Sequence, residues 1–253
     1  MSPLRTAAVL GGGAVGAALV EELPKSGVRV VASWTRSGGL APPPLDGAEV
    51  VLLAVPDAAV APLCARLDVG RGQLVAHLAG ALSLAPLAAA RRKGARVGSI
   101  HPLRAFVRGR AQDFRGAFAG VTGSDASARG QLADLAWRLG MTPLLIGDRS
   151  RALYHAAAVL AAGSQVALFA EAVRAFRKAT GASEPDARAA LLPLAIGALE
   201  NLRTQLPEHA LTGPAARGDK VTIAAHRKAL SKDFLPLYDA LTRVSLRLAR
   251  KNR

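Results

Sequence analysis

Residues 6–16 read TAAVLGGGAVG, a run of five mostly apolar residues followed at once by a glycine-rich loop. Three of its glycines have the spacing G-x-G-x-x-G, and a helical pattern begins directly after them. In such a loop the first glycine permits a tight turn, the second lets the backbone approach a pyrophosphate, and the third allows close helix packing. The position between a strand and a helix favours dinucleotide binding over a glycine turn that serves only packing. The predicted cofactor residues of the loop are Gly11, Gly13, Ala14, Val15 and Gly16.

The end of the next apolar run indicates which dinucleotide the loop binds. An NAD site places an acidic residue about 20 positions after the glycines, where it accepts hydrogen bonds from the ribose hydroxyls. Here the run ends Trp34-Thr35-Arg36-Ser37, and no acid follows until Asp46. A guanidinium pairs with phosphate through its planar fork, so Thr35 and Arg36 suit the 2′-phosphate of NADP. The alternative is an exposed arginine in an arginine-rich chain. We predict NADP as the cofactor.

Short apolar runs alternate with helical patterns through the first 150 residues. Such an alternation is typical of a parallel sheet that is covered by helices on both faces. The fold class we expect is α/β, with an N-terminal Rossmann-type parallel sheet followed by an all-helical C-terminal domain. The predicted strands are Thr6–Leu10, Val28–Trp34, Glu49–Ala54, Gln73–Leu78, Arg96–His101, Ala117–Thr122 and Thr142–Ile146, and the helices between them include Ala14–Leu23, Ala58–Leu67 and Ala126–Leu139.

Strand signals stop after Gly147-Asp148. We therefore predict a dinucleotide-binding domain over residues 1–148 and a helical domain over residues 149–253. A long helix over residues 151–176 begins the second domain. Nineteen residues between Arg151 and Glu171 carry no formal charge, which is close to the length of a membrane span. Polar and small residues interrupt the stretch, so we expect a buried helix and no membrane association.

Several polar residues follow the predicted strands at their carboxyl ends, the edge where open parallel sheets bind ligands. Val55 and Pro56 follow the third strand, and we place them near the nicotinamide side of the cofactor. His77 ends the fourth strand and is favoured as a structural group. His101, which precedes Pro102 and Arg104, ends the fifth strand and is the better candidate for chemistry.

Two further features belong to the helical part. Tyr154-His155 lies near the start of the long helix, where it would point back to the sheet edge. The loop at residues 211–219 reads LTGPAARGD and brings together a hydroxyl, a cation and a carboxylate. It is either a simple connection, with Asp219 capping the next helix, or part of a site with Arg217. No cluster of histidines and acids has metal-ligand spacing, so no metal site is predicted.

These motifs resemble a known family of bacterial proteins, in which a Rossmann-like domain precedes a DUF2520 domain. The resemblance covers essentially the whole chain, and the residues 211–219 are its most distinctive part. The family is related to ketopantoate reductase, pyrroline-5-carboxylate reductase and F420-dependent NADP oxidoreductases. It tends to have Ser where this chain has Ala79, and Asn near Gly163, a position that can contact substrate in related reductases.

The resemblance and the motifs together predict an NADP-dependent oxidoreductase that reduces a small carbonyl or imine substrate. The alternative is a non-catalytic NADP(H)-binding sensor or interaction protein. The protein must orient the substrate and supply a proton to it. We expect His101 or His155 to supply the proton because histidine ordinarily titrates near neutral pH. Arg217 would hold an anionic substrate group, and Asp219 would orient a neighbour.

Composition excludes several other classes. Of the 253 residues 51% are hydrophobic and 20% are charged, which excludes a disordered chain. The net charge of +15 is divided almost equally between residues 1–150 and 151–253, and aromatic residues make up only 4%, so no nucleic-acid partner is expected. The lone Cys64 and the lack of a signal-peptide pattern favour the cytoplasm. The apolar second domain predicts a homodimer formed through it, as in the related reductases.

Overall fold

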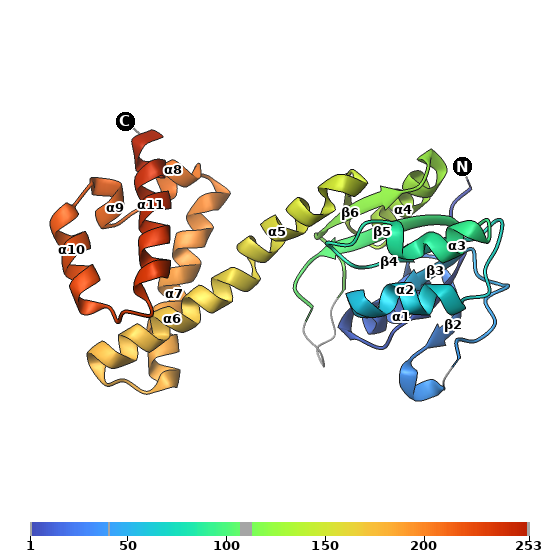
Figure 1. Cartoon of the computed structure of the whole chain (residues 1–253), viewed down its shortest axis with the longest axis horizontal. Coiled ribbons are helices and arrows are strands. Elements are labelled where there is room, and N and C mark those ends of the chain that lie inside the picture. The colour runs from blue at the N-terminus through green and yellow to red at the C-terminus, as the bar shows by residue number, and fades with distance from the viewer. Residues whose placement is uncertain (1, 40, 107–112, 252–253) are drawn as a thin grey trace. The chain divides into compact units, whose positions relative to one another are not determined.

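The computed structural model describes residues 2–39, 41–106 and 113–251. By its internal contacts the chain divides into two compact units, Met1–Ala162 and Gly163–Arg253. The first carries all strands of the described chain, and the second is helical (Figure 1). The α/β fold class is therefore confirmed, whereas the domain boundary near residue 148 stays a prediction.

The first unit is built on a seven-stranded sheet in the order β2-β1-β3-β4-β5-β6-β7. All seven predicted strands are present, with ends that shift by one or two residues. Every neighbouring pair is parallel except β5 and β6, which run antiparallel. The strands are β1 (Thr6–Leu10), β2 (Arg29–Trp34), β3 (Val50–Leu53), β4 (Leu74–His77), β5 (Arg96–Leu103), β6 (Phe118–Gly123) and β7 (Thr142–Leu145).

Helices cover both faces of this sheet, as the fully buried strands β3 and β4 require. One core joins the sheet to α1 and α4 through side chains such as Leu19 and Leu132. A second core on the opposite face includes Leu63 of α2 and Ala90 of α3. The covering helices are α1 (Ala14–Lys25), α2 (Asp57–Arg66), α3 (Ala88–Arg92) and α4 (Ala126–Arg138).

The single helix predicted over residues 151–176 is divided in two. Helix α5 (Arg151–Ala161) belongs to the first unit, and α6 (Gly163–Thr180) begins the second. Ala162 between them has φ −125° and ψ −75°, outside the helical range. Glycine is a poor helix former, so Gly163 is a natural place for this interruption.

The second unit contains α6 and the helices that follow it (Figure 1). Residues 181–183 separate α6 from the next helix, and the 207–219 stretch contains two single-turn helices. The remaining helices of the second unit are α7 (Glu184–Glu200), α8 (Pro207–Ala210), α9 (Pro214–Arg217), α10 (Lys220–Ala229) and α11 (Leu235–Lys251), with the short 3-10 helix η4 (Asn201–Arg203). The first unit also contains the 3-10 helices η1 (Arg36–Gly38), η2 (Ala85–Leu87) and η3 (Asp148–Ser150).

The apolar stretch around α5 and α6 is not buried within one chain. In the described part of the sequence, Asp148–Thr180 is the one helical stretch that is long and apolar enough to cross a membrane, judged by length and composition alone. Only 6% of its apolar window is buried. Leu153 is 77% exposed and Val166 is 72% exposed. Burial of this stretch therefore requires cover from outside the described chain, such as the second copy of the predicted homodimer.

Candidate functional site

Two glycines of the loop between β1 and α1 are required by close packing. Gly11 has φ +132°, and a Cβ built on it would lie 2.0 Å from the carbonyl oxygen of Ala54, at the end of β3. A Cβ on Gly16 would lie 2.0 Å from the carbonyl oxygen of Gly11. The loop therefore turns tightly against the sheet and holds the first turn of α1 close to it, as the spacing predicts.

The middle glycine lies in open space. No heavy atom comes within 4 Å of a Cβ built on Gly13, which is the N-cap of α1. Within the described residues no side chain caps this end of the helix. The first-turn N–H groups, including those of Ala14 and Val15, therefore have no side-chain acceptor. Such N–H groups at a helix N-terminus are suited to bind an anion, so the loop fits the pyrophosphate of a dinucleotide.

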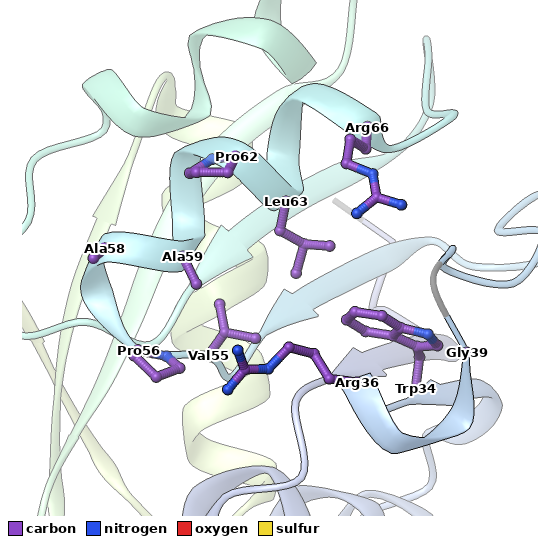
Figure 2. Close-up of a pocket in the computed structure, with 10 residues that line it drawn as sticks. All are labelled: Trp34, Arg36, Gly39, Val55, Pro56, Ala58, Ala59, Pro62, Leu63 and Arg66. Carbon is purple, nitrogen blue, oxygen red and sulfur yellow. The ribbon is translucent and has the colours of Figure 1, made fainter.

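A pocket of about 700 Å³ opens beside the ends of β2 and β3 (Figure 2). Arg36 points its guanidinium toward Val55 and Pro56 at the floor of the pocket, and Arg66 of α2 directs a second guanidinium from above. The complete lining is Trp34, Arg36, Gly39, Val55, Pro56, Ala58, Ala59, Pro62, Leu63 and Arg66. Two cations over an apolar floor suit a ligand with a flat ring and an anionic group.

The predicted cofactor residues outside the loop all lie at or near this pocket. Thr35 packs against Gly12, where an added Cβ would meet its methyl group at 2.6 Å, and its hydroxyl lies 2.8 Å from that of Ser37. The described residues lining the pocket include no carboxylate. Sequence reasoning missed Arg66, because it looks like an ordinary cation in the last turn of a helix. The placement of Val55 and Pro56 near the nicotinamide stays a prediction.

A second group of polar residues lies at the carboxyl end of β4 and β5 within the same unit. The Nδ1 atom of His101 on β5 lies 3.0 Å from the hydroxyl oxygen of Tyr154 on α5. The His101 ring also packs edge to face on His155, with 5.5 Å between ring centroids. The structure thus brings together His101 and His155, the two predicted proton donors, and adds Tyr154.

Gly80, after β4, lies directly under these rings. A Cβ on Gly80 would lie 2.9 Å from Nε2 of His101 and 2.3 Å from Nδ1 of His155, so both nitrogens converge over this glycine. The Nδ1 atom of His155 is buried and has no hydrogen-bond partner in the described structure. A buried nitrogen without a hydrogen-bond partner destabilises the fold. A ligand atom next to Gly80 could supply the missing partner.

His77 has the structural role that the sequence favoured. Its side chain is fully buried, and its Nε2 atom lies 3.0 Å from the carbonyl oxygen of Ser83. Because a carbonyl only accepts, Nε2 must carry the ring proton. His77 therefore fixes the loop after β4, which contains Gly80.

Arg151 is the largest polar group of the interior and was not predicted. It is fully buried at the start of α5 and donates to Thr122 Oγ1 at 2.9 Å and to the carbonyl oxygens of Ala79 and Leu82. No salt bridge to a described carboxylate accompanies these bonds. One guanidinium therefore joins the loop after β4, strand β6 and helix α5. Its positive charge also acts on His77 and His101.

Burial and charge keep both interior histidines neutral. Burial, followed by the charge of Arg151, lowers the pKa of His77 to about 4. Burial, followed by the neighbouring His155 and Arg151, lowers the pKa of His101 to about 4. The expectation that His101 titrates near neutral pH is therefore wrong. At pH 7 its ring is neutral and offers one N–H donor and one acceptor nitrogen.

These shifts predict acid lability. Between pH 6.5 and about 4 the unfolded chain binds protons at His77 and His101 that the folded protein does not. The free energy of unfolding should therefore decrease as the pH is lowered from 6.5 to about 4, by about 1.4 kcal/mol per pH unit for each histidine. Urea unfolding at a series of pH values measures the slope. The variant His77→Asn should show about half of the parent's slope of unfolding free energy against pH. An unchanged slope would contradict the lowered pKa of His77.

Arg217 and Asp219 belong to the second unit. Asp219 caps α10, accepting from the backbone N–H of Thr222 at 3.0 Å and from its hydroxyl at 2.6 Å. This is the connecting role that the sequence left open as the alternative. Arg217 is exposed at the end of α9. The role of both residues in a site with His101 stays a prediction.

Comparison with known proteins places the chain in a family and a fold. A family model described as "Domain of unknown function (DUF2520)" matches residues 117–244, which is just over half of the chain. None of the curated protein sequences compared with this chain matches it. The solved structures that match it include three proteins of similar length.

The first of the three is BF3122 from Bacteroides fragilis, a proposed NADP oxidoreductase, at 21% identity and a TM-score of 0.75 over 97% of this chain and 98% of that chain. A 1-pyrroline-5-carboxylate reductase from Streptococcus pyogenes has 14% identity and a TM-score of 0.65, over 97% and 98%. A reductive aminase from Aspergillus terreus, in complex with NADPH and ethyl levulinate, has 20% identity and a TM-score of 0.62, over 97% and 94%. At these identities the likeness establishes the fold. Together with the family match it confirms the resemblance expected from the sequence, and the chain belongs to the DUF2520 family.

Proposed function

We propose that this protein is an NADP-dependent oxidoreductase that reduces a small carbonyl or imine. One observation carries the proposal: the glycine loop, the pocket with Arg36 and Arg66, and the His101–His155 pair next to Gly80 all lie at carboxyl ends of strands in one sheet. This edge is where open α/β sheets bind their ligands. The described relatives that bind or are proposed to use NADP share the same fold.

Different residues of the first unit bind different parts of the cofactor. The N–H groups at the start of α1 would bind the pyrophosphate, because the space beside Gly13 is open. Thr35 and Arg36 hold the 2′-phosphate, and Arg66 adds a second cation on the other side of the pocket. When bound, the nicotinamide supplies the hydride.

The substrate is held over Gly80 by the two histidines. A neutral imidazole N–H that donates to a carbonyl oxygen or imine nitrogen stabilises the negative charge that develops there. His101 provides this donor, and His155 offers a nitrogen on the same side of Gly80. Arg217 remains the proposed partner for an anionic group of the substrate, and Asp219 remains proposed to orient a neighbouring residue.

Calorimetric titration with NADPH and NADH tests the cofactor assignment. The parent protein should bind NADPH more tightly than NADH. Arg36→Ala should weaken NADPH binding by about 1–3 kcal/mol, the value of a charge-assisted contact to phosphate, and leave NADH binding almost unchanged.

Arg29→Ala is the matched control for this titration. Arg29 is an exposed arginine at the start of β2, the strand that precedes Arg36, so its removal lowers the net charge equally without touching the pocket. Both nucleotides should bind the Arg29→Ala variant as they bind the parent. Equal affinities of the parent for NADPH and NADH would overturn the choice of NADP.

We further propose that the protein is a cytoplasmic homodimer formed through its helical part. The second unit exposes large apolar side chains, among them Val166 of α6 and Leu194 of α7, which are 72% and 70% exposed. A second copy would remove this apolar surface from water. Light scattering that finds a monomer at micromolar concentration would contradict the dimer.

A further inference from the structure

The hydroxyl of Tyr154 lies between a ring nitrogen of His101 and the backbone of Gly120. It lies 3.0 Å from Nδ1 of His101, and the two rings meet edge to face with 5.6 Å between centroids. On its other side the ring of Tyr154 lies on Gly120 of β6. A Cβ on Gly120 would come within 2.7 Å of the hydroxyl oxygen, so only a glycine there leaves space for the tyrosine.

We propose that Tyr154 is a positioning residue that fixes the tautomer of His101, so that Nε2 carries the ring proton and directs it over Gly80. This inference rests on the proposed function for its consequence, because the N–H over Gly80 is the group that would donate to the substrate. The tautomer itself is a property of the free protein, and it is measured without cofactor or substrate.

The direction of the hydrogen bond follows from which groups hold a proton. Burial raises the pKa of the Tyr154 hydroxyl, so it keeps its proton at neutral pH. The backbone of Gly120 lowers that pKa, which is the effect of an N–H donor and not of an acceptor. Among the described residues, Nδ1 of His101 lies within hydrogen-bond distance of the hydroxyl and can accept its proton. A neutral imidazole that accepts at Nδ1 must carry its proton on Nε2.

The tautomer determines what the histidine pair can recognise. Nε2 of His101 and Nδ1 of His155 converge over Gly80. With the proton on Nε2, His101 offers a donor to a carbonyl oxygen or an imine nitrogen. With the proton on Nδ1, the same position would offer a lone pair and would repel that atom. A single hydroxyl 53 residues away in sequence thus selects between donor and acceptor at the site.

Long-range 1H–15N correlation spectra of the histidine rings test the proposal on the full chain without ligands at pH 7. The signals of His101 are assigned by their loss in His101→Gln. In the parent protein Nε2 of His101 should resonate as a protonated nitrogen and Nδ1 as an unprotonated one. In Tyr154→Phe, which keeps the ring and removes only the hydroxyl, both signals should move toward their mean as the two tautomers mix.

Tyr238→Phe is the matched control, because the hydroxyl of Tyr238 lies 2.9 Å from Nδ1 of His226 in the second unit. It should leave the His101 signals unchanged. A parent protein with the proton on Nδ1 of His101, or a Tyr154→Phe variant that keeps the parent pattern, would overturn the proposal. The parent spectrum alone decides the tautomer if Tyr154→Phe does not fold. NADPH titration is independent of this result, so failure of the proposed function would be recognised separately.

Discussion

Replacing Arg151 by Met is expected to lower the free energy of unfolding of the sheet-bearing unit by about 3 kcal/mol. The change leaves three acceptors without their donor: the buried Thr122 Oγ1 and Ala79 carbonyl oxygen, and the part-buried carbonyl oxygen of Leu82. Each unsatisfied acceptor costs about 1–3 kcal/mol, and the relief of removing an unpaired buried charge offsets part of the sum. Urea unfolding followed by circular dichroism measures the difference.

The neighbouring arginine provides the control for this loss. Arg149 is exposed in η3, two residues before Arg151, so Arg149→Met should change stability by less than about 0.5 kcal/mol. Arg151→Lys should be nearly as unstable as Arg151→Met, because one ammonium does not match the fork that joins three separate acceptors. If Arg151→Met and the parent had equal free energies of unfolding, the hydrogen bonds of the guanidinium would not stabilise the packing of α5 on the sheet.

The sheet was predictable because its signals are local. Val50–Leu53 and Leu74–His77 are runs of buried residues between polar breaks, which is how a parallel strand covered on both faces looks in sequence. The glycine spacing likewise needs no distant partner, because Gly16 packs against Gly11 of the same loop. The antiparallel pairing of β6 carries no such signal in an apolar run and was not predicted.

The group formed by His101, Tyr154 and His155 was only partly predictable, because its contacts join residues far apart in the sequence. The sequence places His101 at a strand end, but the approach of Tyr154 depends on where α5 packs on the sheet. Nothing local marks Arg151 as buried, since a cation at the start of a helix is ordinarily solvated. The shifted pKa of His101 follows from that same packing, so residue type alone gave the wrong titration range.

The variants His101→Ala and His155→Ala are each expected to lower turnover by about 10²- to 10⁴-fold, the range for loss of a proton-donating or hydrogen-bonding catalytic group. NADPH affinity should change little, because neither side chain lines the pocket that holds Arg36 and Arg66. Oxidation of NADPH at 340 nm across a panel of small keto acids, imines and aldehydes provides the assay. Persistent silence of the parent with tight NADPH binding would favour a binding protein without turnover.

His209→Ala is the control for the loss of an imidazole, because His209 is exposed on α8 of the second unit and belongs to no proposed site. It should keep the parent rate. The division of the loss between kcat and KM then reports what His101 does: a group that acts only in the transition state lowers kcat and kcat/KM equally. If both His101→Ala and His155→Ala keep full activity, the substrate is not activated over Gly80 and the proton donor lies elsewhere.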